Sequence, residues 1–502
     1  MPEARPFNRY WTEIDTPELT NPTLQFSKDN DRILYSAAFR RLSYVSQVVG
    51  PNETGIFHNR LIHSIKVGQV ARRIAHRLRE VASNDRALSA RIEKFGGLDS
   101  RVVNAACLAH DLGHPPFGHT AELALQKIHS SSPNSDERTR STYYPDVPPN
   151  YFLPDGFSAS AQSFRIVTRL AFREPYQKIA AISRDQVEIA PDEEGPSPAL
   201  NLTQATLAAM SKYPWTRSNQ PRGLPRRKWG AYDSERDILH WATASLEERS
   251  ADIYGGHEKT EHRSIAAQVM DWADDITYAI HDVEDFFRIG VIPLDELRRS
   301  TYLFDEFLTY AFPKVQKKLA VDEGTLRSWL DSKKRSLLPR ESYSGSRRDR
   351  EILHGFAAQL INDAVNDVNV VDEGILAPSL EQLAVIEMFK LLTWYYVLEG
   401  VSLSSVRRGQ VRLIRELFRD LIAWVEESYD TAARGSLPAR LVNYLDVATQ
   451  SVTTSDQYND QQKISRAVTD YIASLTESQA VELEARLSGK SLGSILEGWL
   501  NV

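Results

Sequence analysis

The chain has 502 residues, of which 42% are hydrophobic and 25% charged, and its formal net charge is -7. This is the composition of an ordinary soluble protein with a sizeable core, and it argues against a generally basic nucleic-acid surface. The sequence shows no run of 18 apolar residues and no apolar leader, so we expect a cytoplasmic protein that does not enter a membrane. The single cysteine, Cys107, excludes internal disulfides and cysteine-based zinc clusters.

The first patterned regions of the chain predict helices. Residues 28–50 are expected to form a charged turn, a short helix and an exit segment that carries Gln47. From Arg60 to Leu78, apolar residues recur at helical intervals, which predicts an amphipathic helix that carries His63. A lone histidine on such a helix is more often a core or surface residue than a metal ligand.

The densest group of ionisable residues follows. Residues 102–109 are small and apolar, which predicts a buried helix that delivers His110 and Asp111 into the interior. Burying an unpaired charge costs several kcal/mol or more, and a divalent metal is the simplest partner for this pair. Glycines and prolines then break the helix, and Thr120 is expected to cap the next helix, which carries Glu122.

The remainder of the chain alternates between irregular tracts and helical patterns. Tracts without periodicity run over residues 130–154, 174–200 and 217–230, and the last of these is basic. Apolar periodicity predicts further helices over residues 161–172, 202–212 and 264–287. It also runs nearly throughout the C-terminal 200 residues, for instance over 383–398 and 413–429. We find no convincing strand alternation, internal repeat or glycine-rich phosphate loop. The predicted fold class is therefore all-α.

Four side chains on different predicted helices are candidates to close a metal site. They are His63, His110, Asp111 and one aspartate of the helix over residues 264–287. Mixed imidazole and carboxylate ligation suits zinc, manganese, iron or, more weakly, magnesium. The spacing of the ligands does not choose among these metals.

Other polar residues are candidates for proton transfer and anion binding. His119 and Glu122 are three residues apart, so on a helix they share a face and can act as an acid/base couple. The alternative is a pair at a helix start, where the dipole favours the glutamate. Arg60, Lys212 and Lys228 are candidates to hold an anion, although a single basic residue is more often a solvated surface charge.

Taken in order, these motifs resemble those of HD-domain phosphohydrolases, and more narrowly the bacterial deoxyguanosinetriphosphate triphosphohydrolase family. The resemblance covers most of residues 28–290. Its marks are Ser36–Leu42 with Gln47, Arg60–His63, His110–Glu122, Lys212–Trp215, Lys228–Gly230 and Ala273–Tyr278 with Asp282. It implies an HD-domain core over residues 1–300, with irregular insertions near 130–155 and 174–230, and a helical C-terminal region over 301–502 packed on that core.

The resemblance also implies an activity and a cofactor. The expected reaction is hydrolysis of a deoxynucleoside triphosphate, with dGTP as first candidate, to the deoxynucleoside and inorganic tripolyphosphate. The expected cofactor is a divalent metal, with magnesium or manganese as first candidates. The metal ligands would be His63, His110, Asp111 and Asp274. Asp274 is preferred to Asp275 because Tyr278 and Asp282 follow it at i+4 and i+8, on one helical face.

The resemblance assigns roles to the remaining site residues. His119 and Glu122 would form the catalytic couple, and His114 would be a further phosphate contact. Gln47, Tyr278 and Asp282 would recognise the deoxyribose, and the triphosphate contacts would be Arg60, Lys212, Tyr213 and Lys228. The expected assembly is a homo-oligomer, such as a hexamer.

One segment departs from the family pattern. Ser158-Ala159-Ser160 stands where the family usually has Glu-His-Asn, so a histidine expected near the phosphates is absent. Two alternatives therefore stay open. One is another HD nucleotidase or phosphodiesterase. The other is a weakly catalytic protein that binds nucleotides, or single-stranded DNA along the basic residues 217–228.

Overall fold

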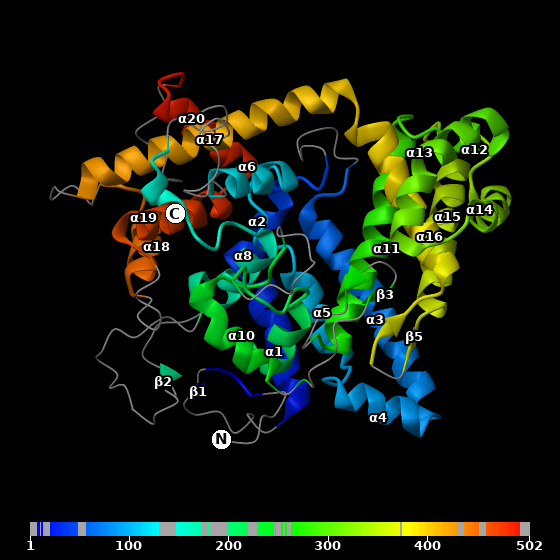
Figure 1. Ribbon diagram of the computed structural model, residues 1–502, viewed down its shortest axis with the longest axis horizontal. Coiled ribbons are helices and arrows are strands. Elements are labelled where there is room, and N and C mark those ends of the chain that lie inside the picture. Colours follow the sequence, from blue (N-terminus) through cyan, green and yellow to red (C-terminus); the bar gives the residue numbers. More distant parts are fainter. Residues whose placement is uncertain are drawn as a thin grey trace.

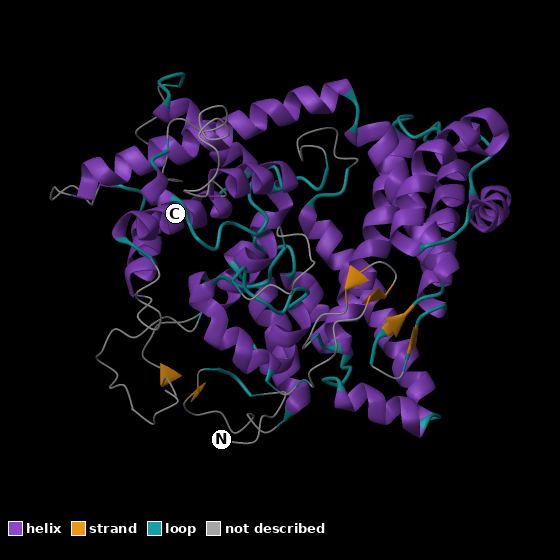
Figure 2. Ribbon diagram, in the orientation of Figure 1, coloured by secondary structure: helices purple, strands orange, loops and turns teal. Residues whose placement is uncertain are grey.

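The computed structural model is built almost entirely from helices (Figures 1 and 2). It describes residues 8–10, 12–13, 21–48, 57–129, 147–171, 179–180, 199–218, 228–244, 246, 253–254, 257–258, 263–371, 374–429, 436–450 and 458–491. Within these ranges the strands form short antiparallel pairs, which are β1 (Thr12–Glu13) with β2 (Ile179–Ala180), β3 (Ile253–Tyr254) with β4 (His257–Glu258), and β5 (Asn369–Val370) with β6 (Leu376–Ala377). The predicted all-α class is confirmed.

A short buried helix, α5 (Ser100–Ala109), lies at the centre of the fold. It packs against α1 (Pro22–Leu34), α3 (Arg60–Ser83), α9 (Gln204–Met210) and α11 (Ile265–Arg288). Its small side chains allow this close approach, and Cys107 is fully buried among them, as a core residue should be. Gly68 of α3 faces the same helix, because an added Cβ there would lie 2.6 Å from Asn104 Oδ1.

The C-terminal helices form two groups joined by one long helix. The first group, α13 (Thr301–Leu319), α14 (Glu323–Leu337), α15 (Arg347–Asn366) and α16 (Leu380–Thr393), packs on α11 through α15 and α16. From this group, α17 (Val401–Tyr429) runs across the molecule to α18 (Ala439–Gln450), α19 (Asp460–Ser474) and α20 (Glu477–Leu487) (Figure 1). The middle of α17 covers α6 (His119–His129). Residues from both halves of the sequence therefore share one hydrophobic core.

The remaining elements are short. The helices are α2 (Ala37–Arg41), α4 (Arg86–Lys94), α8 (Ala159–Arg165), α10 (Arg236–Thr243) and α12 (Leu294–Arg299). The helical turns are η2 (Leu42–Tyr44), η3 (Pro149–Tyr151), η4 (Ile166–Leu170), η6 (Asp233–Glu235) and η7 (Trp394–Leu398).

The starts of α6 and α20 differ. The prediction for Thr120 is wrong: α6 begins at His119, because the turn before it already bonds Glu122 N–H to the Gly118 carbonyl, so Thr120 lies within the helix. At the other end of the chain, Thr476 and Gln479 form the reciprocal bonds of a capping box at the start of α20.

Much of the irregular sequence lies outside the described residues. This holds for 130–146, 172–178, 181–198 and 219–227, so the expectations for those tracts stay predictions. Among the helices that the structure describes, none combines the length and the apolar character needed to cross a membrane.

Candidate active site

Three helices bring together the four predicted metal ligands. Asn59 caps α3 and so places His63 in its first turn, while His110 and Asp111 directly follow the C-terminal end of α5. Asp274 lies in the middle of α11. Its Oδ1 atom is 2.9 Å from His63 Nε2 and 3.7 Å from His110 Nε2. His110 Nε2 is also 3.4 Å from Asp111 Oδ1, so all four side chains converge.

The orientation of His110 is fixed by the backbone. Its Nδ1 lies 2.6 Å from the Cys107 carbonyl, and this contact directs Nε2 toward the two carboxylates. Nε2 is buried without a hydrogen-bond partner among the described residues. Burial opposes a charge on this ring, but Asp111 and Asp274 outweigh it and raise the pKa of His110 to about 9. The site therefore favours a positive charge at this position, and two imidazoles with two carboxylates suit a divalent cation.

Asp111 is held ionised by its neighbours. It is 4% exposed, its Oδ2 accepts a hydrogen bond from Arg60 Nη1 at 2.8 Å, and its Oδ1 lies 2.9 Å from His114 Nδ1. Burial favours the neutral acid, but His110, His114 and Arg60 hold the pKa of Asp111 well below its usual value. Arg60 is itself buried, and its Nε and Nη2 atoms have no hydrogen-bond partner in the described part of the chain. These donors can bind an anion beside the metal ligands.

The two neighbouring acids of α11 have different surroundings. Asp275 Oδ1 lies 2.5 Å from Lys390 Nζ of α16, on the side of the helix away from His63. Asp274 faces the site, where Lys212 Nζ is 3.6 Å from its Oδ2. Burial raises the pKa of Asp274. The hydrogen bonds to His110 and His63 and the charges of His110 and Lys212 outweigh burial and hold the pKa well below its usual value. Geometry thus agrees with the choice of Asp274 over Asp275.

Lys212 and Lys228 both lie near the ring of Tyr213, beside this cluster. Their Nζ atoms lie 5.9 Å and 5.7 Å from the ring centroid of Tyr213. Lys212 also pairs with Asp271, and although burial lowers its pKa, Asp271, Tyr213 and Asp274 together raise it well above the usual value. Three of the four residues predicted to contact the triphosphate, Lys212, Tyr213 and Lys228, therefore lie together, and Lys212 forms ion pairs with the carboxylates of Asp271 and Asp274.

His119 and Glu122 form the predicted couple in the first turn of α6. His119 Nδ1 lies 2.9 Å from Glu122 Oε2, and the other carboxylate oxygen, Oε1, accepts a hydrogen bond from the Ala159 N–H at 2.9 Å. Burial raises the pKa of Glu122, but the bond to His119 and the charges of His119 and His114 prevail and lower it to about 2. An ionised Glu122 thus holds one ring nitrogen of His119, whose side chain is 66% exposed.

His114 lies between the metal ligands and this couple. Its ring is 4.9 Å from that of His119, in an edge-on arrangement. Burial and the charge of Arg60 lower the pKa of His114 to about 4, so the ring is neutral near pH 7. One ligand atom from each of His114, His119 and Glu122 fits within 4.8 Å, which makes them a second group able to hold a cation.

Two of the residues predicted to contact the deoxyribose carry buried oxygen atoms without hydrogen-bond partners among the described residues. Tyr278 and Asp282 follow Asp274 along one face of α11. Asp282 Oδ2 and Gln47 Oε1 are buried without hydrogen-bond partners among the described residues. Burial and the charge of Asp285 raise the pKa of Asp282 well above its usual value. Such groups are expected where a ligand hydroxyl completes the hydrogen bonding.

Sequence reasoning missed three residues that support the site. Ser163 Oγ donates to the His110 carbonyl at 2.7 Å and accepts from the Gly113 N–H at 2.9 Å. Arg41 Nη2 donates to the carbonyls of Leu112 and His114, each at 2.7 Å. Arg407 of α17 lies near enough to Tyr278 to affect its pKa. Arg41 falls in a segment that carries the resemblance, whereas no sequence pattern indicates Ser163 or Arg407.

Comparison with known proteins agrees with this geometry. A family model of the HD domain matches residues 60–146, which contain His63, His110 and Asp111, and a model of the phosphohydrolase-associated domain matches residues 377–486. The helical fold, the histidine and aspartate cluster and these matches define the class of HD-domain phosphohydrolases.

Named relatives narrow the class further. A deoxyguanosinetriphosphate triphosphohydrolase-like protein of Streptomyces coelicolor is 31% identical over 92% of both chains. A protein with the same name from Corynebacterium efficiens is 37% identical over 54% of this chain and 48% of the relative. Another, from Vibrio parahaemolyticus, is 26% identical over 92% of both chains. The chain belongs to the deoxyguanosinetriphosphate triphosphohydrolase-like family.

Proposed function

We propose that this protein hydrolyses deoxynucleoside triphosphates, with dGTP as first candidate, to the deoxynucleoside and inorganic tripolyphosphate. The observation that carries the proposal is the buried cluster of His63, His110, Asp111 and Asp274, in which His110 Nε2 has no hydrogen-bond partner among the described residues. These four residues would hold a divalent cation, with magnesium or manganese as first candidates. When bound, the cation would supply Lewis-acid activation of a phosphate and of water.

The basic residues around the cluster would bind the triphosphate. Arg60 Nη1 is fixed by Asp111 at 2.8 Å, which leaves Nε and Nη2 to donate to phosphate oxygens. Lys228 and Lys212, each within 6 Å of the Tyr213 ring, would add positive charge beside the cluster. These groups would neutralise the charge that develops on the phosphate in the transition state.

His119 would move the proton. Hydrolysis at the α-phosphorus breaks its bond to the 5′-oxygen, and that oxygen must gain a proton as the deoxynucleoside leaves. Glu122 holds Nδ1 of His119, so the opposite nitrogen, Nε2, is the one that can exchange a proton. The Ala159 N–H holds the other oxygen of Glu122 and keeps this carboxylate in place.

Gln47, Tyr278 and Asp282 would recognise the sugar. The unpartnered oxygens of Gln47 and Asp282 can bond the 3′-hydroxyl group. The ring of Tyr278 would lie against the 2′-carbon, where a ribose hydroxyl would clash. Deoxynucleotides would then be preferred, because Gln47 and Asp282 would bind the 3′-hydroxyl group while Tyr278 would exclude a 2′-hydroxyl group.

The reaction products test this proposal. Purified protein is incubated with dGTP and Mn²⁺ or Mg²⁺, and the phosphate products are separated by ion-exchange chromatography. We expect tripolyphosphate in equal amount to deoxyguanosine. Release of orthophosphate or pyrophosphate alone would contradict the proposed reaction, and a panel of dNTPs, NTPs and monophosphates distinguishes it from other HD nucleotidases.

A further inference from the structure

Glu477, the first residue of α20, binds two segments of the proposed active site from the far end of the sequence. It is buried, and one of its oxygens, Oε1, accepts hydrogen bonds from the main-chain N–H groups of Ser46 at 2.7 Å and Phe117 at 3.1 Å. The Ser46 hydroxyl donates to the same oxygen. Glu477 is 431 residues from Ser46 and 360 residues from Phe117 in the sequence, so only the fold brings these groups together.

Each of these bonds holds the backbone beside a residue with a proposed role. Ser46 directly precedes Gln47, which would bind the sugar, and Phe117 lies two residues before His119, which would move the proton. The two segments also lie against each other, because an added Cβ at Gly118 would be 3.3 Å from the Ser46 carbonyl oxygen. One carboxylate oxygen therefore ties the sugar contact to the proton donor.

The backbone of Phe117 needs a partner to keep its conformation. Its φ angle of 68° lies in the left-handed region, which a residue with a bulky side chain rarely adopts. Such a conformation persists only where the surrounding contacts hold it. The next residue, Gly118, accepts the Glu122 N–H at 3.0 Å in the turn that begins α6. A relaxed Phe117 would shift this turn, and His119 would move with it.

The start of α20 is held in place by contacts of its own. Thr476 and Gln479 form the capping box of its first turn, and the carbonyl of Leu475 accepts a hydrogen bond from Arg41 Nη1 at 3.1 Å. Arg41 also donates to the His114 carbonyl at 2.7 Å. Both α20 and α6 pack against α17 (Figure 1). The acceptor oxygen is therefore presented from a fixed position.

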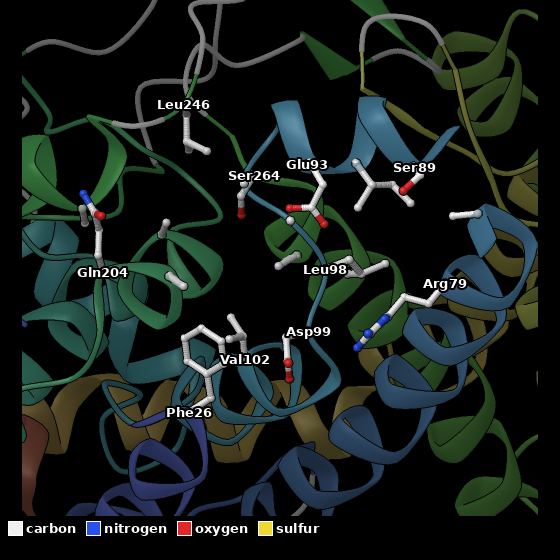
Figure 3. A pocket seen from close by; sticks show the side chains of 18 of the residues that line it. Phe26, Arg79, Ser89, Glu93, Leu98, Asp99, Val102, Gln204, Leu246 and Ser264 are labelled. Carbon is white, nitrogen blue, oxygen red and sulfur yellow. The ribbon is translucent and has the colours of Figure 1, made fainter. Parts of the chain in front are cut away.

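The contacts of Glu477 lie apart from a cavity of about 540 Å³ at the opposite end of α5 from His110 (Figure 3). The residues that line this cavity come from the last turns of α3 and α4 and from the starts of α5, α9 and α11. Glu477, Ser46 and Phe117 are not among them. The hydrogen bonds of Glu477 Oε1 thus serve protein groups and not a ligand in that cavity.

We propose that Glu477 is a positioning residue for the active site. It holds the main-chain N–H groups of Ser46 and Phe117, and so sets the spacing between the sugar contact and the proton donor. Glu477 lies in the region matched by the phosphohydrolase-associated domain, and Phe117 in the region matched by the HD domain. The effect on turnover rests on the proposed function, whereas the hydrogen bonds can be tested without substrate.

Two variants separate hydrogen bonding from charge. Glu477→Gln keeps the length and the acceptor oxygen but loses the charge. Glu477→Asp keeps the charge but is shorter by one methylene group, so it should not reach both N–H groups. Aspartate is favourable in the first turn of a helix, so this variant should fold. The control is Glu482→Ala on the same helix, because Glu482 is partly exposed and pairs with Arg486. Far-UV circular dichroism checks that all three variants fold.

Amide hydrogen exchange, followed by mass spectrometry without substrate, tests the contacts. In Glu477→Asp, the peptides that contain Ser46 and Phe117 should exchange about tenfold faster or more, while those of α15 should not change. Glu477→Gln and Glu482→Ala should exchange as the unmodified chain does. Unchanged exchange in Glu477→Asp, or faster exchange that includes α15, would overturn the proposal.

Turnover of dGTP tests the positioning. The kcat of Glu477→Asp should fall about tenfold or more, because a small displacement of a reacting group is costly. Its Mn²⁺ affinity should stay within about twofold, since the described hydrogen bonds of Glu477 involve no proposed metal ligand. Glu477→Gln and Glu482→Ala should keep kcat within about threefold. A slow Glu477→Gln beside a fast Glu477→Asp would assign the effect to charge and overturn the positioning role.

The two measurements separate this inference from the proposed function. If the unmodified chain does not hydrolyse dGTP, the proposed function falls, while hydrogen exchange still decides whether Glu477 holds the two segments. If the unmodified chain hydrolyses dGTP and Glu477→Asp keeps its full kcat, the positioning role is wrong and the proposed function stands.

Discussion

Asp274 and Asp275 are adjacent in α11, yet their carboxylates bind different neighbours. Asp274 Oδ1 lies 2.9 Å from His63 Nε2, and Asp275 Oδ1 lies 2.5 Å from Lys390 Nζ. Successive side chains on a helix are about 100° apart around its axis, so one acid reaches the candidate active site and the other reaches α16. The pair thus offers a substitution and its control at neighbouring positions.

Replacing Asp274 should abolish metal binding. Asp274→Asn removes one of the two ligand carboxylates, and we expect Mn²⁺ affinity and turnover to fall roughly 100-fold or more. Asp275→Asn loses a partly exposed ion pair, so it should keep the metal and lose about 1 kcal/mol of stability or less. Electron paramagnetic resonance, steady-state kinetics and urea unfolding measure these effects. Equal loss of metal in both variants would contradict the assignment.

Replacing Glu122 should reduce the rate without removing the metal. Glu122→Gln can still accept the Ala159 N–H but cannot stabilise a charged His119, so turnover should fall about 10²–10⁴-fold. Mn²⁺ affinity should stay within about twofold of the unmodified chain, at one ion per chain. Two ions per chain, with one lost in Glu122→Gln, would instead assign His114, His119 and Glu122 to a second cation.

Replacing Tyr278 should weaken the discrimination against ribose. Tyr278→Ala removes the ring that would meet a 2′-hydroxyl, so the ratio of kcat/KM for dGTP to that for GTP should fall about tenfold or more. Tyr278→Phe keeps the ring and should keep the ratio. The role is wrong if the alanine and phenylalanine variants discriminate equally well.

Stability should fall at mildly acidic pH because of His129. This residue is 3% exposed at the end of α6, with Nε2 3.1 Å from Thr469 Oγ1 of α19. Burial, together with the charges of Arg466 and Arg217, holds the pKa of His129 well below 6.5. Below pH 6.5 the unfolded chain therefore binds a proton that the folded chain does not. The free energy of unfolding should fall by about 1.4 kcal/mol per pH unit from this residue.

The variant His129→Gln isolates that contribution. Glutamine does not titrate, so below about pH 6.5 the slope of the unfolding free energy against pH should decrease by the equivalent of one proton, about 1.4 kcal/mol per pH unit. Urea unfolding at several pH values measures the slope. An unchanged slope would show that His129 takes up its proton without unfolding.

The sequence predicted the helices that bury a regular row of apolar side chains. It missed helix boundaries where few of the side chains are both apolar and buried. The pattern places α11 within one residue, Ile265–Arg288 against 264–287. Its clear C-terminal row of apolar side chains begins at residue 413, although α17 begins at Val401, because exposed residues such as Val401 and Val406 interrupt the row. Periodicity detects burial, and the first three turns of α17 have little of it.

Only part of the candidate site could be predicted from the residues themselves. The helix that delivers His110 and Asp111 follows from its small apolar residues, whereas the meeting of these two with His63 depends on tertiary packing that spacing does not encode. The family resemblance supplied that grouping. Ser163 could not be found because its hydroxyl bonds backbone atoms, and such contacts leave no pattern in the sequence.

The contact between Ala159 and Glu122 has a consequence for the variability of this position. The donor is a main-chain N–H, so every amino acid except proline can supply it. Alanine in place of the histidine usual in the family therefore leaves the anchoring of Glu122 untouched. A change of side chain at position 159 that this buried site can hold, where Ala159 is 3% exposed, therefore keeps the hydrogen bond to Glu122.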